Sequence, residues 1–308
     1  MYDVIIIGAG PAGLTAAIYA RRAGKTALLI EKEAFGGQIT LSPHVENYPF
    51  TRPMSGQELA AVLVDQVMDL GAEVEVDTVT GIEKNPDGSL TVRTEFSAFT
   101  GRAVIIATGL KHRRLGVPGE ERFIGRGISF CAVCDGAFYK GRTVAVVGGG
   151  NTAVQDAIYL SKLAKKVYLV HRRDEFRAEK RVTAGLEGCD NIERVLSCVP
   201  AECLGKTALT GLKVRSRVTG EDRVLPVDGI FVAIGQEPNN AAFAGLVELD
   251  PAGFIVADES CRTREKAVFV AGDCRTKAVR QLVTAGADGG VAAIAACEYI
   301  DSEAVKAG

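Results

Sequence analysis

The 308-residue sequence has no strong net charge, no long hydrophobic run, and few cysteines and histidines. Its formal net charge of −2 gives no electrostatic reason to expect a nucleic-acid or membrane partner. No apolar run reaches the roughly 20 residues that a transmembrane helix needs. An apolar strand is expected almost from Met1, which leaves no room for a signal peptide, so we expect a cytoplasmic protein.

Eight cysteines are few for this length, and only Cys131 and Cys134 have C-x-x-C spacing. A structural zinc site of the common type needs a second such pair or paired histidines, and the three histidines are scattered. We therefore predict no metal site. The pair lies in the stretch SFCAVCDGAF (129–138), and a redox dithiol is favoured over a zinc clip or a purely structural disulfide.

Two segments of the chain repeat one pattern. Residues 3–31 and 143–171 align without a gap, and each reads as an apolar strand, a glycine turn, a helix and a second apolar strand. This is a βαβ unit of the dinucleotide-binding type. The first glycine of each turn allows the tight bend, the second lets the backbone approach a pyrophosphate, and the helix N-terminus attracts the phosphates. The sequence therefore predicts two dinucleotide sites.

The two copies differ at the end of the second strand. Glu31 stands where a carboxylate can accept hydrogen bonds from ribose hydroxyls. The equivalent position in the second copy holds His171, followed by Arg172, Arg173 and Arg177. Because guanidinium groups bind phosphate well, we predict that the second nucleotide is NADPH and not NADH.

Two further apolar strands, 102–109 and 267–273, end in small residues. Asp273 stands where a carboxylate can bind the hydroxyls of a sugar chain. Arg280 and Gln281 lie near the start of a small-residue helical segment, which can pack closely against backbone or a flat ring.

Gly- and Pro-containing polar stretches at 110–121 and 233–240 bracket the second unit and are interpreted as hinges. The predicted fold is α/β, with two Rossmann-like dinucleotide-binding domains, the second inserted into a split first domain. A small antiparallel meander is expected before the strand at 104–109.

With these residues assembled, the chain closely resembles the low-molecular-weight thioredoxin reductases of bacteria over essentially its whole length. The resemblance rests on the ordered motifs GAGPAG, GGQIT, VENYP, ATG, CAVCDG, GGGNTA, HRRDEFR, AIGQEPN and AGDC…RQ. It implies FAD in the outer domain (1–112 and 244–308) and NADPH in the central domain (113–243), which also carries the cysteine pair. It further implies a homodimer whose substrate is thioredoxin or a similar protein disulfide.

The resemblance also implies the cofactor contacts. Those to FAD fall on Gly8, Gly10, Pro11, Ala12, Glu31, Gly37, Gln38, Asn47, Ala107, Thr108, Gly109, Gly272, Asp273, Arg280 and Gln281. Those to NADPH fall on Gly150, Asn151, Thr152, His171, Arg172, Arg173, Arg177, Ile234 and Gly235. Gln155 departs from the glutamate that relatives often carry, and its role stays open. Cys274 stands at a usually aliphatic place and is interpreted as a core residue.

The dithiol chemistry follows from spacing. If 131–135 is helical, Cys131, Cys134 and Asp135 share one face. An ionised carboxylate disfavours a neighbouring thiolate, so Asp135 is expected to carry the proton that sulfur gains or loses. By resemblance, Cys134 faces the flavin and Cys131 attacks the substrate.

The dithiol and the NADPH site lie on one inserted segment, yet both must reach the flavin. Rotation about the two hinges during turnover is therefore expected. The alternatives are a peroxiredoxin-reducing flavoprotein, a flavin-dependent dithiol oxidase and a redox sensor of the same fold.

Overall fold

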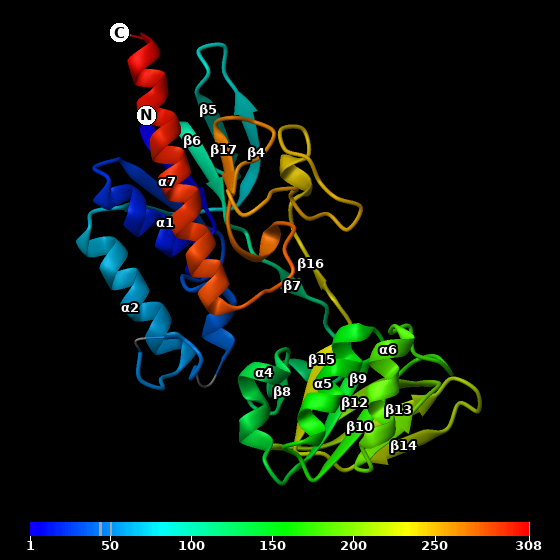
Figure 1. The fold of residues 1–308 in the computed structure, drawn as a ribbon. Coiled ribbons are helices and arrows are strands. Elements are labelled where there is room, and N and C mark those ends of the chain that lie inside the picture. The colour runs from blue at the N-terminus through cyan, green and yellow to red at the C-terminus, as the bar shows by residue number, and fades with distance from the viewer. Residues whose placement is uncertain (43–44, 50, 308) are drawn as a thin grey trace. The chain divides into compact units, whose positions relative to one another are not determined.

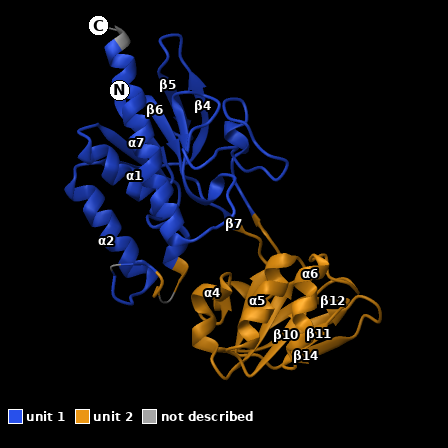
Figure 2. Cartoon of the chain, viewed as in Figure 1, with its two compact units in different colours: residues 1–40, 48–111, 237–308 blue, residues 41–47, 112–236 orange. Residues whose placement is uncertain are grey.

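The computed structural model describes residues 1–42, 45–49 and 51–307. The chain forms two compact units, drawn in separate colours in Figure 2. The first unit contains residues 1–40, 48–111 and 237–308, and the second contains 41–47 and 112–236. Nearly all of the second unit is thus inserted between two parts of the first, and the predicted fold class is confirmed.

Parallel strands form the centre of the first unit's sheet, in the order β3-β2-β1-β6 with β17 beside β6. These strands are β1 (Tyr2–Ile7), β2 (Ala27–Glu31), β3 (Glu73–Val76), β6 (Ala98–Ile106) and β17 (Val268–Val270). Strands β1, β2 and β17 are short runs of mainly branched apolar residues buried on both faces, as expected of a covered parallel sheet.

Figure 1 shows the long helices of the first unit. They are α1 (Pro11–Arg22), α2 (Gly56–Asp69) and α7 (Leu282–Ala307). Helix α2 begins with a capping box, in which Ser55 and Glu58 bind each other's backbone amides. Helix α7 packs closely on α1, because a Cβ added at Gly289 would lie 2.1 Å from the Ala12 carbonyl oxygen.

A meander extends the first sheet on one side. Strands β4 (Val79–Lys84) and β5 (Leu90–Thr94) pair antiparallel with each other, and β5 pairs antiparallel with β6. This confirms the antiparallel meander expected from the sequence. The described residues of this unit also form the 3-10 turns η1 (Gly37–Leu41), η4 (Ala241–Phe243) and η5 (Gly272–Cys274). The last residue of η1, Leu41, is grouped with the second unit.

The second unit repeats the βαβ arrangement in a five-stranded parallel sheet of order β11-β10-β9-β15-β8. Its elements are β8 (Ile128–Ser129), β9 (Thr143–Gly148), α5 (Asn151–Ser161), β10 (Lys166–Val170), β11 (Ile192–Val195) and β15 (Gly229–Ala233). A separate antiparallel sheet contains β12 (Cys198–Gly205), β13 (Leu209–Ser216) and β14 (Asp222–Leu225). Short helical pieces complete the unit: α3 (Glu120–Phe123), α4 (Ala132–Asp135), η2 (Gly136–Tyr139), α6 (Lys180–Thr183) and η3 (Ala184–Gly188).

The chain passes between the units at 111–112 and again at 236–237. The two passing segments, β7 (Lys111–His112) and β16 (Gln236–Glu237), pair with each other as a two-stranded sheet. Both crossings lie within the stretches interpreted as hinges. Among the described residues, no helix combines the length and apolar character that a membrane crossing requires.

Candidate functional site

Cys131 and Cys134 form a disulfide in the second unit, with their Cα atoms 5.3 Å apart. Cys131 is the N-cap of α4, and its Sγ accepts a hydrogen bond from the Cys134 amide at 3.2 Å. Strand β8 ends two residues earlier, so the pair follows the carboxyl end of a parallel strand, where α/β folds commonly place ligands. The short helix brings Asp135 back onto Cys131, because the Asp135 amide donates to the Cys131 carbonyl at 3.1 Å.

The Asp135 carboxyl is buried beside the disulfide. Its Oδ2 accepts a 2.6 Å hydrogen bond from the Ser129 hydroxyl, while its Oδ1 is buried with no hydrogen-bond partner in the described part of the chain. Burial raises the pKa of Asp135, although the bond from Ser129 opposes this shift. A buried acid with one free oxygen is suited to hold a proton and pass it to sulfur.

The first glycine turn joins β1 to α1. A Cβ added at Gly8 would lie 2.4 Å from the Ala107 carbonyl oxygen, and one added at Gly13 would lie 1.8 Å from the Gly8 carbonyl oxygen, so packing alone requires both glycines. Gly10 differs, because an added Cβ there would meet no described atom within 4 Å and its φ of −73° suits any residue. The space in front of Gly10 fits a ligand that approaches the backbone closely, as a pyrophosphate does.

The second turn, between β9 and α5, has the same properties. A Cβ added at Gly148 would lie 2.3 Å from the Ala233 carbonyl oxygen, whereas one added at Gly150 would meet no described atom within 4 Å. Gly10 and Gly150 are the N-caps of α1 and α5, and neither helix start has a side-chain cap. Both helices therefore present uncapped amides to the open space, which fits a bound phosphate group.

Four segments of the first unit meet at the start of α1. An added Cβ at Gly37 would lie 3.1 Å from the Gly10 Cα, and one at Gly272 would lie 2.9 Å from the Ala12 Cβ. Together with the Gly8–Ala107 approach, these contacts bring the residues after β1, β2, β6 and β17 to one place. The structure thus gathers most of the positions expected to contact FAD.

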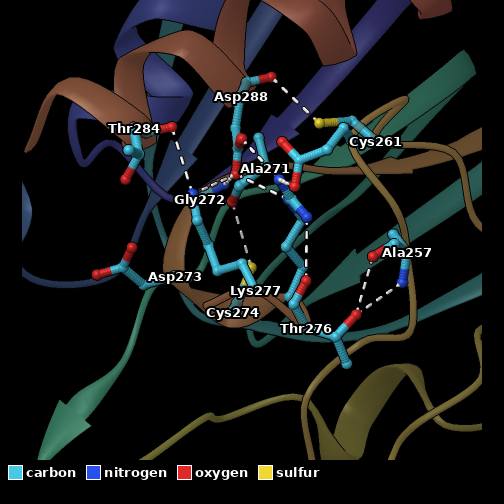
Figure 3. Close-up of polar contacts among 12 residues, drawn as sticks. Ala257, Cys261, Ala271, Gly272, Asp273, Cys274, Thr276, Lys277, Thr284 and Asp288 are labelled. Carbon is cyan, nitrogen blue, oxygen red and sulfur yellow. Dashed lines mark hydrogen bonds and ion pairs between the residues drawn. The ribbon is translucent and has the colours of Figure 1, made fainter. Parts of the chain in front are cut away.

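Asp273 lies at this meeting point, in η5. Its Oδ1 is buried and has no hydrogen-bond partner among the described residues, so a hydrogen-bond acceptor is left for a ligand donor such as a hydroxyl. Burial raises the pKa of Asp273, while the charges of Lys277 and Arg280 act against that shift. Figure 3 shows the Asp273 carboxylate directed away from the polar cluster around Asp288.

Glu31 closes the first turn from the end of β2. Its Oε2 accepts the Ala9 amide at 2.7 Å, and its Oε1 accepts the amides of Lys32 and Glu33 at 2.9 Å each. The carboxylate therefore holds the strand end against the glycine turn.

His171 occupies the corresponding place in the second unit. Its ring packs against the second turn, 2.1 Å from where a Cβ on Gly149 would stand, and its buried Nε2 has no hydrogen-bond partner among the described residues. Burial and the charges of Arg173, Arg177 and Arg172 lower the pKa of His171, so the imidazole is neutral at physiological pH.

The arginines after His171 are exposed around the same turn. The Arg177 amide donates to the Gly149 carbonyl at 2.7 Å, which brings this loop onto the turn. A fourth cation, Arg217, was not identified from the sequence: its Nη1 donates to the Arg172 carbonyl at 3.2 Å. The fold brings the end of β13 beside residues 171–177. The sequence around residue 217 contains no pattern that indicates this proximity.

Comparison with known proteins agrees with this geometry. The model of the pyridine nucleotide-disulphide oxidoreductase family matches residues 2–289. The chain belongs to this family. Thioredoxin reductase of Listeria monocytogenes is 42% identical, covering 98% of this chain and 94% of that protein, and thioredoxin reductase of Bacillus subtilis is 38% identical, covering 98% and 95%.

Two solved structures are nearly equally similar to this chain in sequence. Thioredoxin reductase of Streptococcus pyogenes is 39% identical with a TM-score of 0.93, covering 98% of this chain and 99% of that one. Thioredoxin reductase of Lactococcus lactis, described as the FR conformation, is 38% identical with a TM-score of 0.68, covering 98% and 100%. The sequence-based recognition of this family is confirmed, and FAD and NADPH, its cofactors, are those of this chain.

Several expected cofactor residues of this family member are already engaged within the protein. Gln38 Nε2 donates to the Leu110 carbonyl, and Thr108 Oγ1 donates to Asn240 Oδ1 at 3.0 Å. The Asn151 side chain exchanges hydrogen bonds with Glu179, at 3.0 and 2.8 Å. These bonds fix the side chains around the two turns.

Two further residues expected to contact FAD, Asn47 and Arg280, and the core residue Cys274 lie in different environments. Asn47 is exposed and lies in the segment 41–47, which groups with the second unit. Arg280 stacks over the Phe254 ring at 4.4 Å, and Cys274 is fully buried, as its interpretation as a core residue requires.

Proposed function

We propose that this protein reduces the disulfide of thioredoxin, or of a similar protein, with electrons from NADPH. The observation that carries the proposal is the buried Asp135, with one free oxygen, beside the Cys131–Cys134 disulfide. A structural disulfide has no use for a neighbouring buried acid, whereas a disulfide that opens and closes in each cycle needs a proton donor. The names of the relatives support the same reaction.

We assign FAD to the first unit and NADPH to the second. The residues proposed to hold FAD are Gly8, Gly10, Pro11, Ala12, Glu31, Gly37, Gln38, Asn47, Ala107, Thr108, Gly109, Gly272, Asp273, Arg280 and Gln281. Those proposed to hold NADPH are Gly150, Asn151, Thr152, His171, Arg172, Arg173, Arg177, Ile234 and Gly235. The open approaches at Gly10 and Gly150 and the unpaired Oδ1 of Asp273 support this assignment.

When bound, FAD supplies two-electron transfer between the nicotinamide and the Cys131–Cys134 disulfide. The reduced Cys131 then attacks the substrate disulfide as a thiolate and displaces one substrate sulfur, forming a mixed disulfide. Cys134 attacks that bond, which restores the Cys131–Cys134 disulfide and releases the substrate as a dithiol. Asp135 holds the proton that balances each gain or loss of thiolate. The order of the two cysteines follows the family resemblance.

The two units are proposed to rotate relative to each other in each cycle, about the crossings at 111–112 and 236–237. The two solved relatives support this, since nearly equal identity and coverage come with TM-scores of 0.93 and 0.68. Fluorophores placed at the exposed positions Phe96 and Val218, one on each unit, test it by energy transfer. We expect NADPH to change the populations of two distances, and a single unchanging distance would refute rotation.

The substrate face is proposed to include Val133, which lies between the two cysteines, and Phe138, which follows them in the chain; these residues are 55% and 42% exposed. A relative named bifunctional thioredoxin reductase/thioredoxin, from Mycobacterium leprae, supports thioredoxin as the partner. We also propose a homodimer, in which a second copy covers the exposed Val283, Val291 and Ile294 of α7.

A cytoplasmic location is proposed from the cysteines. Apart from the pair at 131 and 134, the cysteines are free thiols, which is usual in a reducing compartment.

Steady-state NADPH oxidation with and without thioredoxin tests the function. We expect thioredoxin-dependent turnover that Cys131→Ser or Cys134→Ser abolishes while FAD stays bound, with Cys198→Ser as the control because Cys198 is a partly exposed free thiol of the same unit. Equal NADPH oxidation without thioredoxin, driven by oxygen, would instead identify an oxidase. Negligible turnover with both nucleotides bound would identify a sensor.

A further inference from the structure

Asp288 is a buried carboxylate of α7 for which the sequence analysis predicted no role. Its side chain is 7% exposed, and it lies one residue before Gly289, where α7 meets α1. Figure 3 shows Asp288 among the polar contacts of the loop that follows β17.

Among the residues that the structure describes, the hydrogen bonds to this carboxylate come from one short segment, residues 272–277. Oδ2 accepts the Gly272 amide at 3.0 Å, Arg275 Nε at 2.8 Å and Lys277 Nζ at 2.8 Å, and Oδ1 accepts Arg275 Nη2 at 2.9 Å. The carboxylate thus binds the start, the middle and the end of the loop that follows β17. Asp273, the expected FAD ligand, lies inside that loop.

The buried part of the cluster contains two cations and one carboxylate. The Arg275 and Lys277 side chains are 1% and 5% exposed, so both cations depend on Asp288 for compensation. The other acid near Arg275, Glu259, is 90% exposed and 3.2 Å away. Burial opposes ionisation of Asp288, but the bonds from Arg275 and Lys277 outweigh it and lower the pKa of Asp288, so the carboxylate is charged.

The loop has little freedom once Asp288 holds it. Gly272 has a φ of +80°, and an added Cβ there would lie 2.9 Å from the Ala12 Cβ, at the start of α1. With the Gly272 amide turned toward Asp288, the next residue directs its carboxylate away from the cluster, and its buried Oδ1 is left without a partner. The side that faces away from Asp288 is thus left for the cofactor.

We propose that Asp288 is a positioning residue for FAD, which fixes the 272–277 loop so that the Asp273 carboxylate meets the cofactor. The inference rests on the proposed placement of FAD beside Asp273. A purely structural clamp would stabilise the fold without affecting the flavin, so the two roles are separable by measuring how the holoenzyme holds FAD.

The test uses Asp288→Asn, which keeps the side chain's size but removes its charge. The purified holoenzyme is diluted, and free FAD is followed by its fluorescence. We expect the Kd for FAD to rise at least tenfold and the visible absorption bands of the bound flavin to shift. Glu298→Gln is the matched control, because it removes an acid from an exposed ion pair of the same helix, and it should leave both properties unchanged.

A Kd for FAD within twofold of the wild type, with an unchanged flavin spectrum in Asp288→Asn, would overturn the inference. If that variant does not fold, Lys277→Met decides, since it leaves the paired Arg275–Asp288 contact in place. A several-fold rise in its Kd for FAD supports the positioning role, and an unchanged Kd refutes it.

Asp273→Asn separates this inference from the cofactor assignment. If Asp273→Asn leaves FAD binding unchanged, FAD does not contact Asp273, and both the assignment and the inference fall. If Asp273→Asn weakens FAD binding and Asp288→Asn does not, the inference alone is wrong. Binding of 2′,5′-ADP to the second unit should be unchanged in both variants, which shows that any loss of FAD binding is confined to the first unit.

Discussion

The Ser129 hydroxyl donates a 2.6 Å hydrogen bond to Oδ2 of Asp135 and also accepts the Cys131 amide at 3.1 Å. One serine at the end of β8 thus connects the buried acid to the backbone of the first redox cysteine. Burial raises the pKa of Asp135 and the serine restrains that rise, so together they determine the pH range over which the acid keeps its proton.

Replacing Asp135 with asparagine should separate activity from stability. Loss of a positioned acid typically costs about 10²-fold or more in rate, so we expect kcat for thioredoxin reduction to fall by roughly that factor. Because the folded-state pKa of Asp135 is raised, the unfolded chain releases this proton at a lower pH than the native protein does, and native stability falls as pH rises through that interval.

Asp135→Asn has no carboxyl at this position, so it does not lose native stability as pH rises through that interval. Its Tm at pH 7 should therefore equal or exceed that of the wild type, and the difference should vanish below the ordinary carboxyl pKa. Glu193→Gln, which removes a surface partner of Lys166 in the same unit, should leave kcat unchanged. A lower Tm for Asp135→Asn at pH 7 would mean that Asp135 is ionised and structural.

Ser129→Ala should shift the pH profile of the dithiol step. The serine bond lowers the pKa of Asp135, so its removal raises that pKa further, and the alkaline loss of activity should move to higher pH. Stopped-flow measurement of thioredoxin reduction by pre-reduced enzyme from pH 5 to 10 checks this. A shift of the alkaline loss of activity to lower pH, or no shift, would contradict the assignment of that loss to Asp135.

Alanine at Gly148 and alanine at Gly150, both in the second turn, should have different effects. Gly150→Ala meets no protein atom, so the fold and FAD content should be unchanged, while the Kd for NADPH should rise roughly tenfold or more through loss of about 1.5–3 kcal/mol of charge-assisted hydrogen bonding. Gly148→Ala places Cβ 2.3 Å from the Ala233 carbonyl oxygen and should destabilise the unit by about 1–3 kcal/mol.

NADPH titration and urea denaturation of the two variants distinguish these effects. Wild-type affinity for NADPH in a well-folded Gly150→Ala variant would show that no phosphate lies at this turn.

Replacing both Arg172 and Arg173 with alanine should reduce the preference for NADPH over NADH. Charge-assisted hydrogen bonds contribute roughly 1.5–3 kcal/mol each, so losing two should weaken NADPH binding about a hundredfold or more while NADH binding changes little. The ratio of kcat/KM values for the two nucleotides measures this. Arg223→Ala, which removes an exposed arginine paired with Glu193, is the control. An unchanged ratio in the double variant would place the 2′-phosphate elsewhere.

Much of the fold and of the candidate site was accessible from the sequence because it depends on local patterns. The two βαβ units follow from short apolar runs, glycine turns and helical alanines within about thirty residues of each other. Cys131, Cys134 and Asp135 are neighbours along the chain, so their proximity needed only a turn of helix. The insertion of one unit into the other followed from the order of these patterns.

The tertiary structure alone decided the contacts between residues that are far apart in the sequence. Asp288 meets the loop after β17 only because glycines let α7 pack closely on α1, and Arg217 reaches the loop after β10 only because β13 ends beside it. No periodicity or spacing encodes such pairs, since burial and packing geometry determine which distant side chains meet. The same reason explains why Gly8 and Gly10, which look alike in the sequence, differ in the structure. A side chain at position 8 would clash with the carbonyl oxygen of Ala107, just after β6, whereas Gly10 faces open space that fits the cofactor.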